Sequence, residues 1–133
     1  MVGRKGRGGG GWSLVELTIV ISVISILAGM ALIGYRNAIT RSREVVLKEN
    51  LFRIRDGIDQ FYADKGEYPI SLIDLVSAGY LRAVPEDPFT RSSSSWQKEM
   101  AEFDVADPLS QGIYDVGSSF DGMASDGTPY SEW

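Results

Sequence analysis

An uncharged apolar run near the N-terminus constrains this chain more than any other feature. From Leu17 to Tyr35 the sequence LTIVISVISILAGMALIGY contains no charged residue. A helix rises about 1.5 Å per residue, so these 19 residues nearly match the roughly 30 Å hydrocarbon core of a bilayer. The run is therefore long enough to cross a membrane as a helix.

Charge is distributed unevenly about this run. The first eleven residues carry Arg4, Lys5 and Arg7 and no acid, which leaves 10 of the 13 basic residues against all 18 acidic residues in the remainder. The positive-inside rule predicts that the basic end stays cytoplasmic while the acidic remainder is exported. An acidic body without a basic stripe argues against nucleic-acid binding, which needs clustered Lys and Arg to neutralise phosphates.

The composition also limits the chemistry of the chain. Its 133 residues are enough for one small domain with an appendage, and they include no cysteine and no histidine. Disulfides, thiolate nucleophiles, cysteine-histidine zinc sites and the commonest general base are therefore excluded. The adjacent acids Glu86 and Asp87 lie in a proline turn, whereas an active site would need clustered acids that line a pocket. We expect a protein that is not an enzyme.

A conventional secretory signal peptide is an alternative explanation of the apolar run. Its small residues Ala28, Gly29 and Ala31 resemble a cleavage site, and cutting there would release a secreted domain. Glu16 at the edge of the run argues against this, because a signal peptide gains nothing from an acid at that position. The helical pattern also continues past the supposed cleavage point.

The junction before the run, GWSLVE from Gly11 to Glu16, resembles the class III leader of type IV pilins and pseudopilins. The resemblance implies that a prepilin peptidase cuts after Gly11 and methylates the new N-terminal amine of Trp12. The usual first mature residue in this family is phenylalanine, so Trp12 departs from the pattern while keeping a large aromatic ring.

Glu16 requires a partner on physical grounds as well. A charged side chain in an apolar helix costs on the order of 2.5 to 3.5 kcal/mol at the membrane centre. The cation that processing would supply is the freed amine of Trp12, about one helical turn away on the same chain or on a neighbouring subunit. The resemblance implies the neighbour, whereas the simpler alternative is a Glu16 in the headgroup region with no specific partner.

The segment after the apolar run has a second helical pattern. No proline occurs from Trp12 to Tyr68, so one helix is predicted from about Ser13 to about Ala63. Apolar residues recur at steps of four, three, four and three, a stripe that favours a core-facing helix over a short coiled coil. The stripe comprises Leu47, Leu51, Ile54, Ile58 and Phe61, and the charged residues assigned to the outer face are Arg41, Arg43, Glu44, Lys48, Glu49, Arg53, Arg55 and Asp56.

Short elements are predicted after this helix. Ser71 and Asp74 form a capping-box pattern that opens a short helix through about Ser77, closed by Gly79. Two strands, near 95–100 and 112–117, are expected to pair in an antiparallel sheet packed on the helix. The predicted fold class is α+β, and the aromatic residues expected in the core or against the helix are Trp96, Phe103 and Tyr114.

The run from Phe61 to Pro88 resembles the major pseudopilin of type II secretion, whose pattern is YPxxxxxLxxxGYLxxxPxDP after the long helix. In that family a calcium ion sits in the C-terminal loop, and the resemblance makes Asp121 and Asp126 the candidate ligands. Calcium prefers several oxygen ligands, and glycine-rich turns can direct backbone carbonyls toward an ion. Because the family usually has a further acid, two plain Asp-Gly turns are the alternative.

The resulting organisation has four parts: a leader at 1–11, a transmembrane and assembly half of the helix at 12–35, an amphipathic half at 36–63, and a globular head at 64–133. We expect a major pseudopilin-like subunit in the bacterial inner membrane, with its head in the periplasm, that self-associates into a pseudopilus for exporting folded proteins. The resemblance implies a prepilin peptidase, an inner-membrane assembly platform and minor pseudopilins as partners. A surface type IV pilus is the nearest alternative, and a secreted calcium-binding domain is the alternative from another class.

Overall fold

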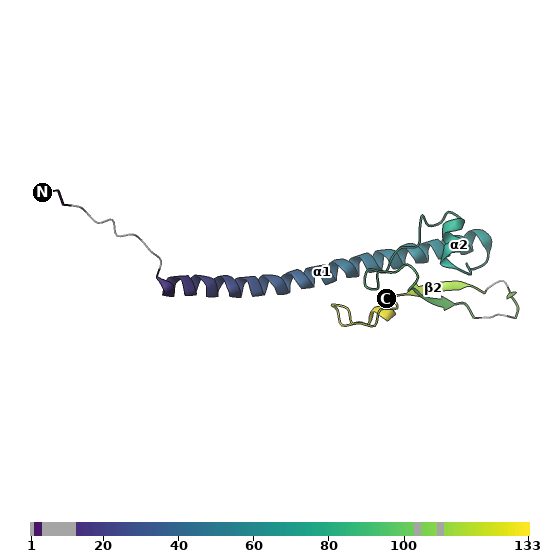
Figure 1. Ribbon diagram of the computed structural model, residues 1–133. Helices are drawn as coiled ribbons and strands as arrows, with labels where there is room; N and C mark the ends of the chain where they lie inside the picture. The colour runs from purple at the N-terminus through teal and green to yellow at the C-terminus, as the bar shows by residue number, and fades with distance from the viewer. Residues whose placement is uncertain (1, 4–12, 103–104, 109–110) are drawn as a thin grey trace. The chain divides into compact units, whose positions relative to one another are not determined.

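The computed structural model describes residues 2–3, 13–102, 105–108 and 111–133. The chain forms two compact units, Met1–Ala38 and Ile39–Trp133. The predicted α+β class, a long N-terminal helix with a small antiparallel sheet, is confirmed. In chain order the elements are α1 (Leu14–Lys65), α2 (Leu72–Ser77), β1 (Gln97–Met100), β2 (Ile113–Gly117) and the short 3-10 helix η2 (Tyr130–Glu132) (Figure 1).

Helix α1 runs close to its predicted limits, beginning one residue after Ser13 and ending two residues after Ala63. Its last turn is followed by Gly66, whose N–H donates to the carbonyl of Tyr62 at 2.8 Å. The absence of proline lets the helical hydrogen bonds continue through both the apolar and the charged parts of the sequence.

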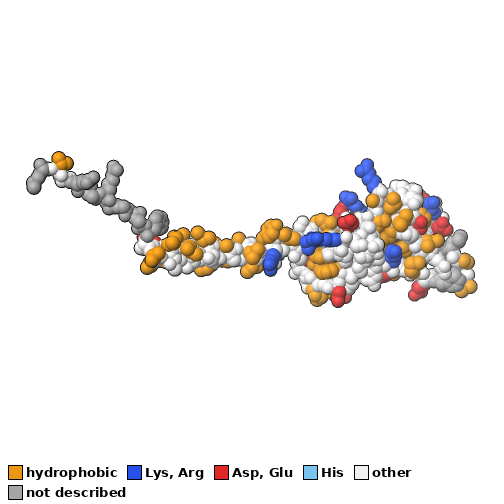
Figure 2. Space-filling view, in the orientation of Figure 1, with side chains coloured by type: hydrophobic (Ala, Val, Ile, Leu, Met, Phe, Trp, Pro, Cys, Tyr) orange, Lys and Arg blue, Asp and Glu red, His pale blue; other side chains and the backbone are white. Residues whose placement is uncertain are grey.

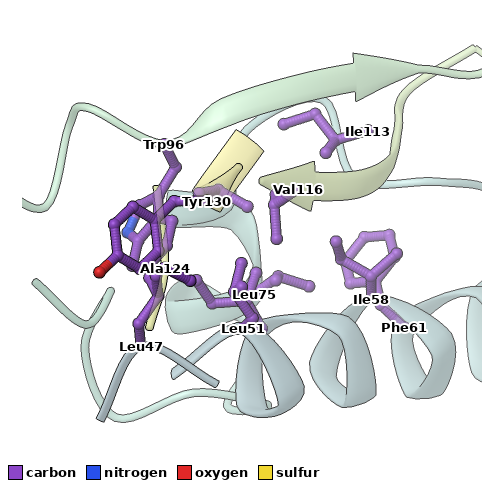
Figure 3. Packing of buried hydrophobic residues seen from close by; sticks show 12 residues of the cluster. Leu47, Leu51, Ile58, Phe61, Leu75, Trp96, Ile113, Val116, Ala124 and Tyr130 are labelled. Atoms are coloured by element: carbon purple, nitrogen blue, oxygen red, sulfur yellow. The ribbon is translucent and has the colours of Figure 1, made fainter. Parts of the chain in front are cut away.

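The hydrophobic core lies in the unit Ile39–Trp133 and is built on the predicted stripe of α1. The five stripe residues are all buried, with exposed fractions from 0% to 6%. Because all five are buried, the prediction of a core-facing helix is confirmed. Burying a side chain of this size contributes about 1.5–3 kcal/mol to stability. The stripe packs in one cluster with Leu72, Leu75, Trp96, Ile113, Val116, Ala124 and Tyr130 (Figure 3).

Helix α2 begins and ends as its sequence predicts. The Oγ of Ser71 accepts a hydrogen bond from the N–H of Ile73 (3.3 Å), and the N–H of Ser71 donates to the Asp74 carboxylate (2.8 Å). After the helix, Gly79 adopts a φ of 85°, a left-handed conformation that favours glycine and ends helices. These caps place Leu72 and Leu75 against α1.

The sheet consists of β1 and β2 in antiparallel order, as predicted. Glu99 pairs with Asp115, whereas the next residue of β1, Met100, pairs with Ile113. Tyr114 is therefore an extra residue in β2, which makes a bulge and interrupts the normal alternation of side chains. As a result Ile113 and Val116, three positions apart, are both buried.

The bulge corrects one of the predictions for the aromatic residues. Tyr114 was expected in the core or against the helix, but it is 45% exposed and its hydroxyl donates to Glu99 at 2.7 Å. Trp96 is buried as predicted, and its indole N–H donates to the carbonyl of Pro85 at 2.8 Å. Phe103 lies outside the described residues.

A close backbone contact joins the sheet to the segment that follows α1. A Cβ atom on Gly112 would lie 2.6 Å from the carbonyl oxygen of Tyr68. The two backbone segments can approach this closely only because residue 112 is glycine. The next N–H, that of Ile113, donates to the carbonyl of Pro69 at 2.8 Å. The Tyr-Pro pair of the predicted motif thus fixes where β2 begins.

Candidate functional site

The first half of α1 exposes its apolar side chains. Fourteen large hydrophobic residues between Leu14 and Tyr35 are each at least 40% exposed, and hydrophobic side chains cover much of the visible surface of this part of the helix (Figure 2). By length and composition α1 can cross a membrane. A continuous apolar surface of this kind marks contact with lipid or with other protein surfaces.

The polar side chains within this half are satisfied by the helix itself. The hydroxyls of Thr18, Ser22 and Ser25 donate to the backbone carbonyls of Leu14, Thr18 and Ile21, each at 2.7 Å and each four residues back. An unpaired hydroxyl would be costly away from water. Because these three hydroxyls are paired internally, they need no outside hydrogen-bond partners in an apolar environment.

Glu16 lies in the first turn of α1 and forms a reciprocal cap with Ser13. The N–H of Ser13 donates to Glu16 Oε2 at 3.0 Å, and the N–H of Glu16 donates to Ser13 Oγ at 3.2 Å. These bonds satisfy two backbone donors that a helix start would otherwise leave unpaired. Glu16 therefore has a role in its own chain, at the N-terminal end of the exposed apolar surface.

This cap was not predicted, although the sequence contains its signature. Ser13-x-x-Glu16 has the same serine-to-acid spacing as the pair that opens α2. The cleavage and methylation sites, Gly11 and Trp12, lie outside the described residues. Pairing of Glu16 with the amine of Trp12 stays a prediction, as does cleavage after Gly11.

The two predicted calcium ligands lie in the loop that precedes η2. Asp126 Oδ1 accepts hydrogen bonds from the N–H and the hydroxyl of Thr128, at 2.9 and 2.6 Å. These bonds hold the pKa of Asp126 below its usual value. Within the described ranges, no three His, Cys, Asp or Glu side chains gather closely enough to hold a metal ion.

This donor set fits calcium poorly. Calcium takes six to eight oxygen ligands, and of the two carboxylates offered, Asp126 already uses one oxygen to close its own turn with Thr128. That turn is the geometry of the alternative interpretation, in which Asp-Gly pairs serve as plain turns. Calcium binding at Asp121 and Asp126 stays a prediction.

The same loop contacts a buried acid that sequence analysis placed wrongly. Glu44 was assigned to the charged outer face of α1, but it is only 6% exposed. It lies three residues before Leu47 and seven before Leu51, which puts it on the core-facing side of the helix. Its Oε1 accepts from the N–H of Ser125 (2.7 Å) and the hydroxyl of Tyr130 (2.9 Å), and its Oε2 accepts from the Ser125 hydroxyl (2.6 Å).

The charge of Glu44 follows from these contacts. Burial favours the neutral acid, but the hydrogen bonds from Ser125 and Tyr130 outweigh it, so the pKa of Glu44 lies below its ordinary value of 4.5. Burial and the bond to Glu44 raise the pKa of Tyr130 to about 12. At neutral pH the carboxylate is therefore ionised and the tyrosine keeps the proton that it donates.

A second buried acid organises the proline turn. Asp87 is 0% exposed; its Oδ2 accepts from the Ser118 hydroxyl at 2.5 Å, and its Oδ1 accepts from the N–H groups of Phe89 and Thr90 at 2.8 and 3.3 Å. The bonds from Phe89 and Thr90 close the turn itself, and the bond from Ser118 joins the turn to the segment after β2. The aspartate of the predicted PxDP pattern is thus a folding residue in this structure.

Comparison with known proteins gives one similarity. The chain is 36% identical over 78 residues to "Fimbrial protein EcpC" from Eikenella corrodens, a match that covers 56% of this chain and 46% of that protein. The chain thus spans about half the length of this relative. No protein-family profile matches the chain, and no solved structure does. The similarity supports a pilin-like chain and leaves open whether it serves a secretion filament or a surface fibre.

Proposed function

We propose that this chain is a pilin-like subunit that anchors in a bacterial inner membrane and assembles into a filament through its N-terminal helix. The observation that carries the proposal is the exposed apolar half of α1, whose hydroxyl groups are already paired with its own backbone. Lipid would cover this surface before assembly, and neighbouring copies would cover it in the filament. No catalytic step is part of the proposal.

The more specific form of the proposal is a major pseudopilin of type II secretion. A prepilin peptidase cuts after Gly11 and methylates Trp12, and the head stays in the periplasm. An assembly platform and minor pseudopilins then direct a short pseudopilus that helps folded proteins to cross the outer membrane. The Tyr-Pro and Pro-Glu-Asp-Pro run between Phe61 and Pro88 favours this form by its resemblance to major pseudopilins.

A surface pilus is the second candidate, and the name of the fimbrial relative favours it. The two candidates predict different losses when the gene is deleted from its native host. A pseudopilus subunit is needed for export of folded proteins, whereas a pilus subunit is needed for a surface fibre. Secreted protein and sheared surface fibres, measured on the same deletion strain, would choose between them.

The first test is the intact mass of the protein from native membranes. We expect a chain that begins at Trp12 with one added methyl group, and a Gly11→Ala variant that stays uncut. An uncut wild-type chain, or one beginning near residue 30, would overturn the proposal in favour of a simple anchor or a secreted domain. Normal cleavage of the Gly11→Ala variant would contradict the assignment of the leader but would not contradict the filament proposal.

The second test concerns Glu16. A Glu16→Ala variant should be cut and membrane-bound but should assemble poorly, because the neighbour's amine loses its partner. The cap with Ser13 requires a control, so a Ser13→Ala variant, which removes the cap from the other side, is measured in parallel. Filament yield should fall at least tenfold for Glu16→Ala and much less for Ser13→Ala. Equal losses would assign Glu16 to capping rather than to assembly.

A further inference from the structure

We propose that the buried Glu44 carboxylate closes the C-terminal loop of the head onto α1, and that this closure is independent of metal. The loop, residues 121–129, and the following η2 supply three hydrogen bonds to this carboxylate. Its donors lie 81 and 86 positions away in the sequence, so the contact joins the beginning of the head unit to its end. It is independent of the proposed filament function.

The geometry makes Glu44 an anchor for the loop. Ser125 donates through both its N–H and its hydroxyl, one to each carboxylate oxygen, while Tyr130 adds a third bond from η2. Bonds to a buried charged acceptor are stronger than those between neutral groups. Tyr130 is itself 2% exposed and packs with Phe89, their ring centroids 4.4 Å apart, so the anchored hydroxyl belongs to a rigid side chain.

Two further residues continue the attachment along α1. The ammonium of Lys48 lies 4.0 Å from the centre of the Trp133 ring, within the range of a cation–π interaction. Arg55 donates to the backbone carbonyls of Val116 and Trp133, at 2.9 and 2.7 Å. With Glu44 at the N-terminal end of this series, three positions along the helix hold the loop, the C-terminal Trp133 and the end of β2.

The loop also closes on itself through backbone bonds. The N–H of Ala124 donates to the carbonyl of Thr128 at 2.7 Å, and the N–H of Tyr130 donates to that of Gly122 at 3.1 Å. Together with the Asp126–Thr128 turn, these bonds hold the loop in shape while Glu44 holds it in place. A metal would therefore contribute little that the side chains do not already provide.

Hydrogen exchange on the full-length protein in detergent tests this proposal. Deuterium uptake is measured over 118–133 in wild type, Glu44→Gln and the control Glu49→Gln, each with calcium and with a chelator. Gln keeps the shape of Glu44 but places an amide donor against the donors of Ser125 and Tyr130. We expect at least tenfold faster uptake in Glu44→Gln, wild-type uptake in Glu49→Gln, and no effect of the chelator on wild type.

Two outcomes would overturn the proposal. One is faster deuterium uptake in the wild-type protein on chelation, which would indicate that calcium bound by Asp121 and Asp126 holds the loop in place. The other is a Glu44→Gln variant that exchanges like wild type. If Glu44→Gln does not fold, Ser125→Ala and Tyr130→Phe each remove a donor and should speed uptake several-fold, and unchanged uptake in both would reject the anchor.

Discussion

The two parts of α1 differ in whether their apolar side chains are exposed or buried. Between Leu14 and Ala38 they face outward, whereas between Ile39 and Lys65 those of the stripe are buried against the head. The second part buries the hydrophobic residues of its stripe within one chain, while Val45, Val46 and Phe52 stay exposed. The first part leaves its own for lipid or for another copy. The same helix therefore stabilises the fold in one region and, under the proposed function, supports anchoring and assembly in the other.

The strongest test of this contrast is truncation of one isoleucine from each region. Ile54 is 0% exposed and Ile24 is 59% exposed. Ile54→Ala should destabilise the head by about 2–5 kcal/mol because it leaves a cavity, and its melting temperature should fall by roughly 10 °C or more. Ile24→Ala should leave the melting temperature of the head unchanged. Thermal unfolding of the detergent-solubilised chain, followed by tryptophan fluorescence, measures both.

Equal losses for the two variants would break the contrast. They would mean that the first part of α1 contributes to the stability of the head. A small loss for Ile54→Ala alone would instead show that the core relaxes around the missing side chain, which is the known source of variation in such substitutions.

A charge placed in the first region should impair anchoring rather than folding. Ile24→Arg puts an arginine near the middle of the apolar run, at a cost of about 2.5 to 3.5 kcal/mol in a membrane. That corresponds to a loss of roughly a hundredfold in membrane partitioning. Ile70→Arg, at a residue of the head that is 78% exposed, is the matched control. Carbonate extraction of membranes should release the first variant and retain the second, while retention of both would contradict a membrane role for the run.

The buried Glu44 of α1 sharpens the comparison through pH. Because the folded pKa of Glu44 lies below its ordinary value of 4.5, its contribution to stability is complete above that value and is lost as pH falls through the folded pKa. Tyr130 and Asp126 are the titratable groups that act on it. The difference in melting temperature between wild type and Glu44→Gln should be constant from pH 8 to about pH 5 and should shrink at lower pH. A difference that grows on acidification would contradict an ionised anchor.

Local sequence signals predicted the features whose causes are local. The spacing of the stripe on α1, the cap of Ser71 and Asp74, and the turn at Gly79 each depend on neighbouring residues. The Ser13–Glu16 cap was equally readable from its spacing. It was not predicted because Glu16 was interpreted either through the amine of Trp12 or as a headgroup-region residue with no specific partner.

Features that depend on distant contacts were not predictable in this way. Glu44 looked like one more surface charge, because its partners Ser125 and Tyr130 are more than eighty residues away. Its position three residues before Leu47 was the available signal, since an acid that continues an apolar stripe lies on the buried face. Tyr114 followed the alternation expected of a strand, and only the register of β1 and β2 reveals the bulge that exposes it.

The smallest expected effect comes from an acid close to Glu44 in the same helix. Glu49 pairs with Arg53 at 2.8 Å, with the two side chains 56% and 65% exposed. Exposed pairs four residues apart contribute about 0.3–0.5 kcal/mol, so Glu49→Ala should move the melting temperature by no more than a few degrees. Glu44→Ala should cost far more, because it leaves the donors of Ser125 and Tyr130 without their acceptor. If the two variants melted alike, burial and hydrogen bonding would not distinguish these acids, and Glu44 would be a surface charge after all.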